Sequence, residues 1–414
     1  MKLSTTYRIR GGDTFETIAR RVYGTEQEAL RVAQANPGVE EPLSPGVAIT
    51  VTALPSTPVN LPQQTEAENI NEVAVLIDDE RFRFWDSLRI TRAVDALDVV
   101  EFGAPFDPEL ESFRNTFRPF EYKDIGVSVG GVPLFTGTAV SVNPILENLR
   151  SVVSVSGYSL PGVMADCTAP ASAFPLEFEG QGLLEIAKTV AGYFGIGVEF
   201  TADQGDVFTD PVALEPGGKA LQFLIGLAQQ RGLVISSTPG GALLFQKSVE
   251  SGNPTVNLEQ GRSPLLSVTP FFSPEDYYSS ITGITPVVIG SQGSQFTVKN
   301  DSLSGVLRPF TFKAPDTTES SAPTAVHAKL GRMFANMASY SVRLNTWRDP
   351  SGSLWTPNTT INLLAPDAMI YSNYEFILRS VEFNKDRVTE TATLDLVMPG
   401  AFSGREPETV PWGE

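Results

Sequence analysis

Residue types that build catalytic and metal sites are scarce in this chain. Its 414 residues include one cysteine, Cys167, and one histidine, His327. A single cysteine cannot form an intrachain disulfide, so folding does not depend on an oxidising compartment. A zinc site needs a cluster of Cys and His ligands, and a thiol nucleophile would need the histidine beside it. We therefore expect no catalytic residue, no metal and no cofactor.

Basic residues are also few. The chain has 30 Lys and Arg against 48 Asp and Glu, a formal net charge of −18. Such a surface repels phosphates and anionic lipid head groups, which excludes general nucleic-acid binding. The charge is uneven, because residues 1–60 hold six basic and six acidic side chains. The whole negative excess therefore lies in residues 61–414.

Long apolar runs are absent. The most apolar helical stretch, near Leu221–Ala228, is far shorter than the roughly 20 residues that a membrane span needs. The first ten residues contain no apolar signal segment. We expect a protein made in the cytoplasm, without membrane insertion, that remains soluble or joins an assembly.

What is present is a mainly β pattern with α+β parts. Gly and Pro, 35 and 31 residues, punctuate many short apolar runs. The pattern divides the chain into a small N-terminal unit (1–53), a Pro-rich linker (54–70), a first β-rich domain (71–165), an α+β insert (166–261), a second β-rich domain (262–402) and a polar tail (403–414).

Several hairpins and helices can be predicted within these parts. Gly130-Gly131 lies between alternating apolar residues, and both glycines tolerate the positive φ of a tight turn. A long hairpin is expected from residues 376–398, with its turn at 384–387. Helical spacing predicts helices over 183–194, from about 219 to 231, and over 323–340, the last with Tyr340 on its apolar face.

Residues 7–52 resemble a LysM domain. The matching residues are Tyr7 to Phe15, Ile18-Ala19, Tyr23-Gly24, Leu30, Asn36-Pro37, Leu43, Pro45-Gly46 and Ile49 to Val51. The resemblance implies a β-α-α-β order and binding of N-acetylglucosamine polymers such as peptidoglycan. The groove would consist of Gly12, Asp13, Thr14, Phe15, Asn36 and Pro37. A purely structural reading also stands, in which Asp13 caps the first helix and Asn36-Pro37 ends the second.

The remainder resembles the Mu-like and late-control-D family of phage baseplate hub proteins. The resemblance rests on Leu88–Arg92, on the segment from Val153 to Pro161, on the turn Gly352-Ser353-Leu354-Trp355-Thr356-Pro357-Asn358, and on the ending Pro399-Gly400-Ala401-Phe402. It implies two tube-like β-barrels that flank the insert, and a homotrimer that closes six barrels into a ring. Such a ring joins the six-fold tail tube protein to the three-fold spike protein, beside other baseplate proteins of a contractile-tail virion, and forms part of the channel for genome ejection.

The negative charge suggests how such a channel would be lined. A wall that lets DNA pass must not hold it, so acidic or neutral side chains are favoured there. The acids on predicted strands and turns are Asp95, Asp98, Glu101, Glu382, Glu390 and Asp395.

Two other functions remain as alternatives. LysM domains often accompany cell-wall hydrolases, and 48 acids offer many carboxylate pairs for a glycosidase. The first alternative is therefore a peptidoglycan hydrolase that carries a LysM domain, and the second is a free carbohydrate-binding protein. Residues 71–402 show hairpins without a marked active site, which favours the structural hub, and activity on cell-wall material separates the hydrolase from it.

Overall fold

The computed structural model describes residues 4–9, 12–23, 29–39, 41–52, 70–147, 150–284, 295–313, 321–402 and 409–413. Contacts group the chain into two compact units. Unit 1 consists of residues 1–88 and 101–157, and unit 2 of residues 89–100 and 158–414. The predicted polar tail at 403–414 and the linker at 54–70 fall mostly outside the described residues.

The N-terminal part of unit 1 has the elements β1 (Ser4–Arg8), α1 (Phe15–Tyr23), α2 (Ala29–Gln34) and β2 (Ala48–Thr52). The two strands pair antiparallel, with Tyr7 opposite Ile49. Both residues are buried with Ile18 of α1 and Val32 of α2 in one small core. Phe84, from the β-rich part of the same unit, packs against this core.

The rest of unit 1 is built on a sheet in the order β6-β9-β8-β7-β3-β4, in which the pairs β8-β7, β7-β3 and β3-β4 are antiparallel. Its elements are β3 (Val73–Ile77), β4 (Glu80–Phe82), β5 (Ser87–Ala93), β6 (Val99–Pro105), α3 (Glu111–Thr116), β7 (Asp124–Val129), β8 (Val132–Glu147) and β9 (Arg150–Ser159). Strands β5, β6 and β9 each have residues in both units. Gly130 and Gly131 adopt φ of 58° and 78° between β7 and β8, which confirms the predicted hairpin.

The first part of unit 2 has its own core. Its elements are α4 (Val163–Asp166), β10 (Leu176–Phe178), α5 (Leu183–Gly192), β11 (Val198–Phe200), β12 (Val212–Leu214), α6 (Ala220–Gln230), β13 (Val234–Ser237) and β14 (Leu243–Gln246). The sheet β11-β14-β13 and the two longer helices bury apolar residues from Met164 to Phe245. Helices α5 and α6 confirm two of the helix predictions.

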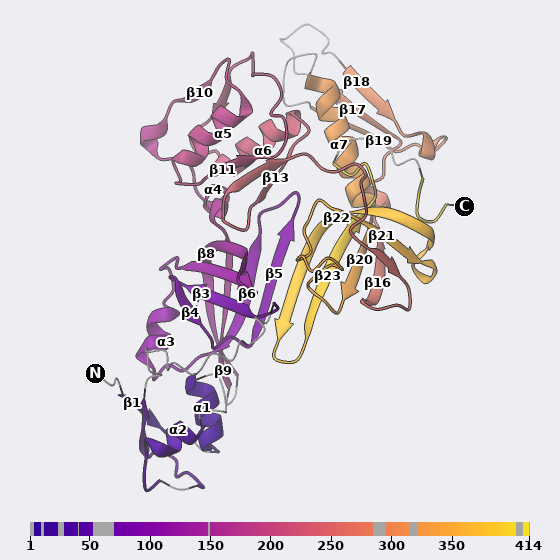
Figure 1. Ribbon diagram of the computed structural model, residues 1–414. Helices are drawn as coiled ribbons and strands as arrows, with labels where there is room; N and C mark the ends of the chain where they lie inside the picture. The colour runs from indigo at the N-terminus through magenta and orange to yellow at the C-terminus, as the bar shows by residue number, and fades with distance from the viewer. Residues whose placement is uncertain are drawn as a thin grey trace. The chain divides into compact units, whose positions relative to one another are not determined.

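The remaining elements of unit 2 are mostly strands: β15 (Asn257–Glu259), β16 (Leu265–Phe272), β17 (Ser280–Ile284), β18 (Gln295–Lys299), β19 (Pro309–Lys313), α7 (Ser321–Met337), β20 (Ala338–Leu344), β21 (Thr360–Ala365), β22 (Ile370–Asp386) and β23 (Glu390–Val397). One path runs β16-β20-β23-β22, with β21 beside β22 and β15 beside β21. A second sheet, β18-β17-β19, lies against α7 (Figure 1).

Two predictions need correction here. Helix α7 ends at Met337, so Tyr340 lies on β20, where it pairs with Pro270 and Leu396. Strand pairing on both sides determines its conformation, and helical spacing in the sequence cannot show this. The expected barrels are not found as closed sheets either, because no strand path closes on itself among the described residues of this single chain. The mainly β architecture with an α+β part is confirmed.

Candidate functional site

The predicted N-terminal groove contains two polar residues that the fold already uses. Asp13 is 7% exposed, and its carboxylate accepts from the Tyr7 hydroxyl at 2.9 Å and from Arg21 Nη1 at 3.0 Å. Arg21 Nη1 also donates to the Tyr7 oxygen. Burial raises the pKa of Tyr7 to about 12, against the opposing charge of Arg21. The Asp13 carboxylate therefore holds β1 and α1 together.

Asn36 is used in the same way. Its amide donates to the carbonyls of Val32 at 2.8 Å and Thr50 at 2.7 Å, and its oxygen accepts from the Thr50 N–H at 2.6 Å. These bonds join the end of α2 to β2. Of the predicted groove, Gly12 and Pro37 are exposed, and Thr14 and Phe15 are half-buried.

The helix cap differs from the prediction. Helix α1 begins at Phe15, so Thr14 holds the N-cap position, and its hydroxyl accepts from the Thr17 N–H at 3.2 Å. The Thr17 hydroxyl accepts in return from the Thr14 N–H at 2.7 Å. This reciprocal pair satisfies two N–H groups at the start of the helix, and Asp13, expected as the cap, binds Tyr7 and Arg21.

The acids expected to line a channel are mostly paired with bases. The ion pairs are Asp95 with Arg379 at 3.1 Å, Asp98 with Arg92 at 3.0 Å, Glu382 with Arg89 at 3.7 Å and Glu390 with Lys385 at 2.5 Å. Asp395 lies within the electrostatic reach of Arg379, and burial raises its pKa. Glu101 is exposed on β6. The net charge these six residues present is thus much smaller than their number suggests.

Asp98 is the most buried of them. It is 1% exposed, its N–H donates to Ser237 Oγ at 3.0 Å, and its carbonyl accepts from the Ser159 N–H at 2.8 Å. Burial raises the pKa of its carboxyl to about 6, and the charge of Arg92 opposes that rise. Asp98 therefore belongs to the interior of unit 2 and fastens residues 92–98 to β13.

The turn that carries the hub resemblance has a clear structural role. Asn358 has φ of 68°, and its amide donates to Gln246 Oε1 and to the Lys247 carbonyl, both at 3.0 Å. Its oxygen accepts from the Val249 N–H at 2.8 Å. Trp355, 1% exposed, braces the turn through Nε1, which donates to the Thr346 carbonyl at 3.0 Å. Asn358 thus joins the end of β14 to the C-terminal strands.

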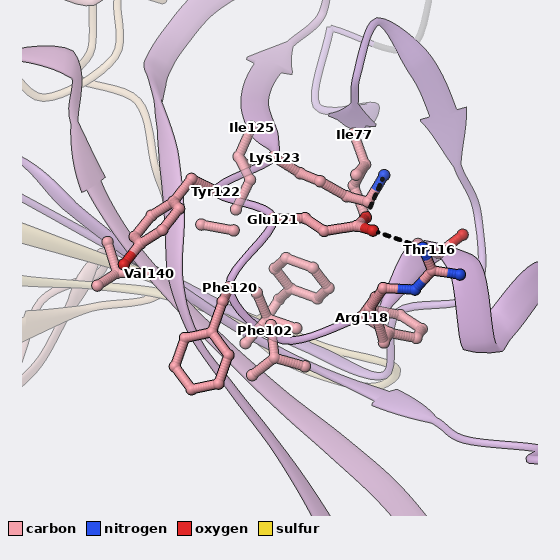
Figure 2. Close-up of a pocket in the computed structure, with 14 residues that line it drawn as sticks. Ile77, Phe102, Thr116, Arg118, Phe120, Glu121, Tyr122, Lys123, Ile125 and Val140 are labelled. Carbon is pink, nitrogen blue, oxygen red and sulfur yellow. Dashed lines mark hydrogen bonds and ion pairs between the residues drawn. The ribbon is translucent and has the colours of Figure 1, made fainter.

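Unit 1 presents an exposed aromatic surface that the sequence did not reveal. Phe120 and Tyr122 are 85% and 58% exposed, and both have positive φ, 64° and 50°. Figure 2 shows both rings at the mouth of a hollow that Ile77, Phe102 and Val140 help to line. Positive φ is a strained backbone conformation for bulky residues. Here it accompanies two aromatic side chains that point away from the core.

Charged residues hold this loop in place. Glu121 accepts from Arg118 at 3.0 Å, and its other carboxylate oxygen lies 3.3 Å from the Lys123 ammonium. Dashed lines mark ion pairs of this loop in Figure 2. Lys123 also donates to Asp78 at 2.7 Å, in the turn between β3 and β4. Phe120 and Tyr122 together form an exposed apolar surface, the aromatic loop.

Cys167 and His327 have different surroundings. Cys167 is exposed, and the ring of His327 lies 5.8 Å from that of Phe296. Within the described ranges, no group of His, Cys, Asp and Glu could hold a metal ion. No described helix is long and apolar enough to cross a membrane.

Comparison with known proteins gives the context for this geometry. Residues 161–247 match the family described as baseplate hub protein gp44-like, second domain. This range coincides with the separate core between Met164 and Phe245. A comparison with curated proteins finds no match.

Solved structures extend the likeness beyond that domain. The 43 kDa tail protein of prophage MuSo2 from Shewanella oneidensis is 23% identical, with a TM-score of 0.69 over 80% of this chain and 99% of that one. A tail protein from Neisseria meningitidis MC58 is 18% identical, with a TM-score of 0.68 over 80% and 98% of the two chains. The E. coli c3393 protein, described as a type VI secretion component similar to T4 tail proteins gp27 and gp5, is 9% identical, with a TM-score of 0.51 over 81% and 80%.

These matches establish a shared fold. The chain has the fold of phage tail proteins, and its residues 161–247 are similar to the second domain of gp44-like hub proteins. The resemblance to phage baseplate hubs is supported to that extent. Residues 1–53 lie outside the matched family domain, and their LysM identity stays a prediction.

Proposed function

We propose that this protein is the structural hub of a contractile phage baseplate. The observation that carries the proposal is a gp44-like hub domain set within a chain whose fold matches nearly the whole length of two phage tail proteins. Three copies would form an adaptor between the tail tube and the spike, around a channel for DNA. The open strand paths support this, since unpaired edges offer sites for neighbouring chains.

The native mass tests the trimer directly. The protein is measured alone and with its spike protein by light scattering after size exclusion. A mass of three chains, alone or with three spike chains, is the expected result. A monomer that persists with the spike protein present contradicts the trimer.

The aromatic loop is proposed as a contact between copies of the chain. Phe120 and Tyr122 are exposed in the single chain at a cost in backbone strain, which an intersubunit contact would offset. Replacing both with serine should weaken the trimer at least tenfold and leave the monomer folded. Leu307→Ser, which removes a side chain that is 90% exposed elsewhere, is the matched control.

The channel wall is proposed to be close to neutral. Asp95, Asp98, Glu382 and Glu390 are each paired with a base, so the predicted acids together present less net negative charge than their number suggests. A trimer structure with a wall of Lys and Arg would contradict this.

Peptidoglycan binding through residues 1–53 is a further part of the proposal. Because Asp13 and Asn36 are used within the fold, sugar contacts would come from Gly12, Thr14 and Phe15, with Pro37 at the edge. Phe15→Ala should abolish co-sedimentation with purified peptidoglycan if the groove binds sugar. Unchanged co-sedimentation in that variant points to a docking or structural role instead.

A further inference from the structure

A cavity in unit 2 gathers positive charge in an otherwise acidic protein. Its volume is about 330 Å³, and it lies between the end of α6, strand β19 and helix α7. Three cations line it: Lys313 from the end of β19, and Lys329 and Arg332 from α7. The cavity lining formed by the described residues includes no Asp or Glu. At about 30 Å³ per water molecule, the space holds far more than one ion.

The local sequence explains why the cavity exists. Ala325, Lys329 and Arg332 follow one another at helical spacing, so they share a face of α7, and the small Ala325 leaves room beside the long cations. Phe310 and Phe312 alternate on one face of β19 and form an apolar wall, with ring centroids 6.1 Å apart.

The positive charges of Lys329 and Arg332 have little compensation from nearby acids in the cavity lining. The Lys329 ammonium lies 4.9 Å from the centroid of the Phe310 ring. No hydrogen bond or ion pair of Arg332 is found among the described residues. Burial lowers the pKa of Arg332, and the more distant charge of Asp95, itself paired with Arg379 at 3.1 Å, only partly opposes this. A half-buried guanidinium without a close acid is set up to receive one.

Gln230 also belongs to the lining. Gln230, in the last turn of α6, is 8% exposed, and its Oε1 has no hydrogen-bond partner among the described residues. The end of α6 adds a partial negative charge of about half an electron, too little to offset three cations.

We propose that this cavity, lined by Lys313, Lys329, Arg332, Phe310, Phe312 and Gln230, binds an acidic peptide segment of a partner protein. Carboxylates contact Lys329 and Arg332, and the aliphatic or aromatic part of the segment packs on the two phenylalanines. Charge complementarity favours this occupant. Nucleic acid is disfavoured, because the net charge of −18 repels a long polyphosphate outside the cavity.

The test uses the full chain and a fluorescein-labelled peptide, Gly-Glu-Glu-Phe-Glu-Gly, with Gly-Gln-Gln-Phe-Gln-Gly as the neutral probe. Fluorescence anisotropy at low salt should show binding of the acidic peptide alone. The double variant Lys329→Gln/Arg332→Gln should weaken it at least tenfold. The control Lys188→Gln/Arg262→Gln removes the same charge from exposed sites elsewhere in unit 2 and should change affinity less than twofold. Circular dichroism confirms that both variants fold.

Five outcomes overturn the proposal. These are no binding of the acidic peptide by the wild-type chain, equal binding of the neutral peptide, and equal losses in the cavity and control variants. The fourth is displacement of the peptide by inorganic phosphate at an equal concentration, which assigns the cavity to small anions. The fifth outcome is measured by sedimentation of the same variants. If only the cavity variant loses self-association, and the acidic peptide competes with self-association of the wild type, the occupant is a second copy of this chain. A separate partner protein is then excluded.

Discussion

The amide of Asn358 donates a hydrogen bond of 3.0 Å to Gln246, a residue 112 positions earlier in the chain. The sequence near either residue does not predict this contact. It joins the gp44-like domain to the strands that follow that domain within unit 2. The turn with its buried tryptophan therefore fixes one part of the unit to another.

The first prediction concerns this contact. Asn358→Gly keeps the positive φ but removes three hydrogen bonds, each worth about 0.5–1.5 kcal/mol, so the free energy of unfolding should fall by about 1.5–4.5 kcal/mol. Asn358→Ala adds backbone strain of about 1 kcal/mol and should be the less stable of the two. Urea unfolding measures both. Equal stability of wild type and Asn358→Gly would show that water replaces the lost bonds.

The second prediction concerns pH. Because burial raises the pKa of Asp98 from 3.8 to about 6, the folded state retains a proton between these values that the unfolded chain releases. Stability contributed by this group is therefore present at low pH and is lost as pH rises through 4 to 6. At 1.4 kcal/mol per pKa unit, the loss is on the order of 3 kcal/mol.

Asp98→Asn removes this titration. The difference in unfolding free energy between wild type and variant should change by that amount from pH 4 to pH 7, in the direction that disfavours the wild type at pH 7. Urea unfolding at four pH values measures the difference. If the unfolding free energies of wild type and variant run parallel with pH, Arg92 stabilises the Asp98 carboxylate enough to cancel the effect of burial on its pKa.

The third prediction concerns the N-terminal part. A chain that begins at residue 70 should remain folded, because the core of the first 52 residues is closed around Tyr7 and Ile18. It should be less soluble, since Phe84 loses its cover and keeps only neighbours such as Phe113, 5.6 Å away. Phe84→Ser in the truncated chain should restore solubility in light scattering. A truncated chain without cooperative unfolding contradicts the separation.

The fourth prediction concerns the aromatic loop. Phe120 has φ of 64° and little packing to lose, so Phe120→Gly should leave the monomer equally stable or stabilise it by up to about 1 kcal/mol. Phe120→Val places a β-branched residue at the same φ and should destabilise it by at least about 1 kcal/mol. Thermal unfolding of the two variants gives the comparison. A stabilising valine would contradict the strain.

Local chemistry made several elements predictable from sequence. The prediction of the Gly130-Gly131 turn was correct because two adjacent glycines at positive φ specify a tight turn. Helices α5 and α6 could be predicted because the apolar spacing within each segment is enough to indicate a helix. Lys385 and Glu390 lie opposite each other in the hairpin of β22 and β23, so the strand register brings them into an ion pair. The position of Glu390 in the sequence does not reveal this pairing unless the opposite strand is taken into account.

Distant contacts explain what was missed. Tyr340 follows α7 without a glycine or proline to end the helix, and the pairing of β20 with β16 and β23 decides its conformation. Asp98 resembles any surface acid in sequence, and only its contact with Ser237, 139 residues away, shows that it is buried. The cavity on α7 needed three separate elements to be brought together.

The parallel pair of β15 and β21 has a consequence for synthesis. Asn257 pairs with Asn362, so 105 residues separate the two strands. At about 5–20 residues per second, a ribosome needs roughly 5–20 seconds to supply the partner. The gp44-like domain has its whole core by Phe245 and can fold in that interval. Strand β16, with Leu266 and Phe271 exposed even in the finished chain, emerges long before β20 and stays open to chaperones or to other nascent copies until β20 appears.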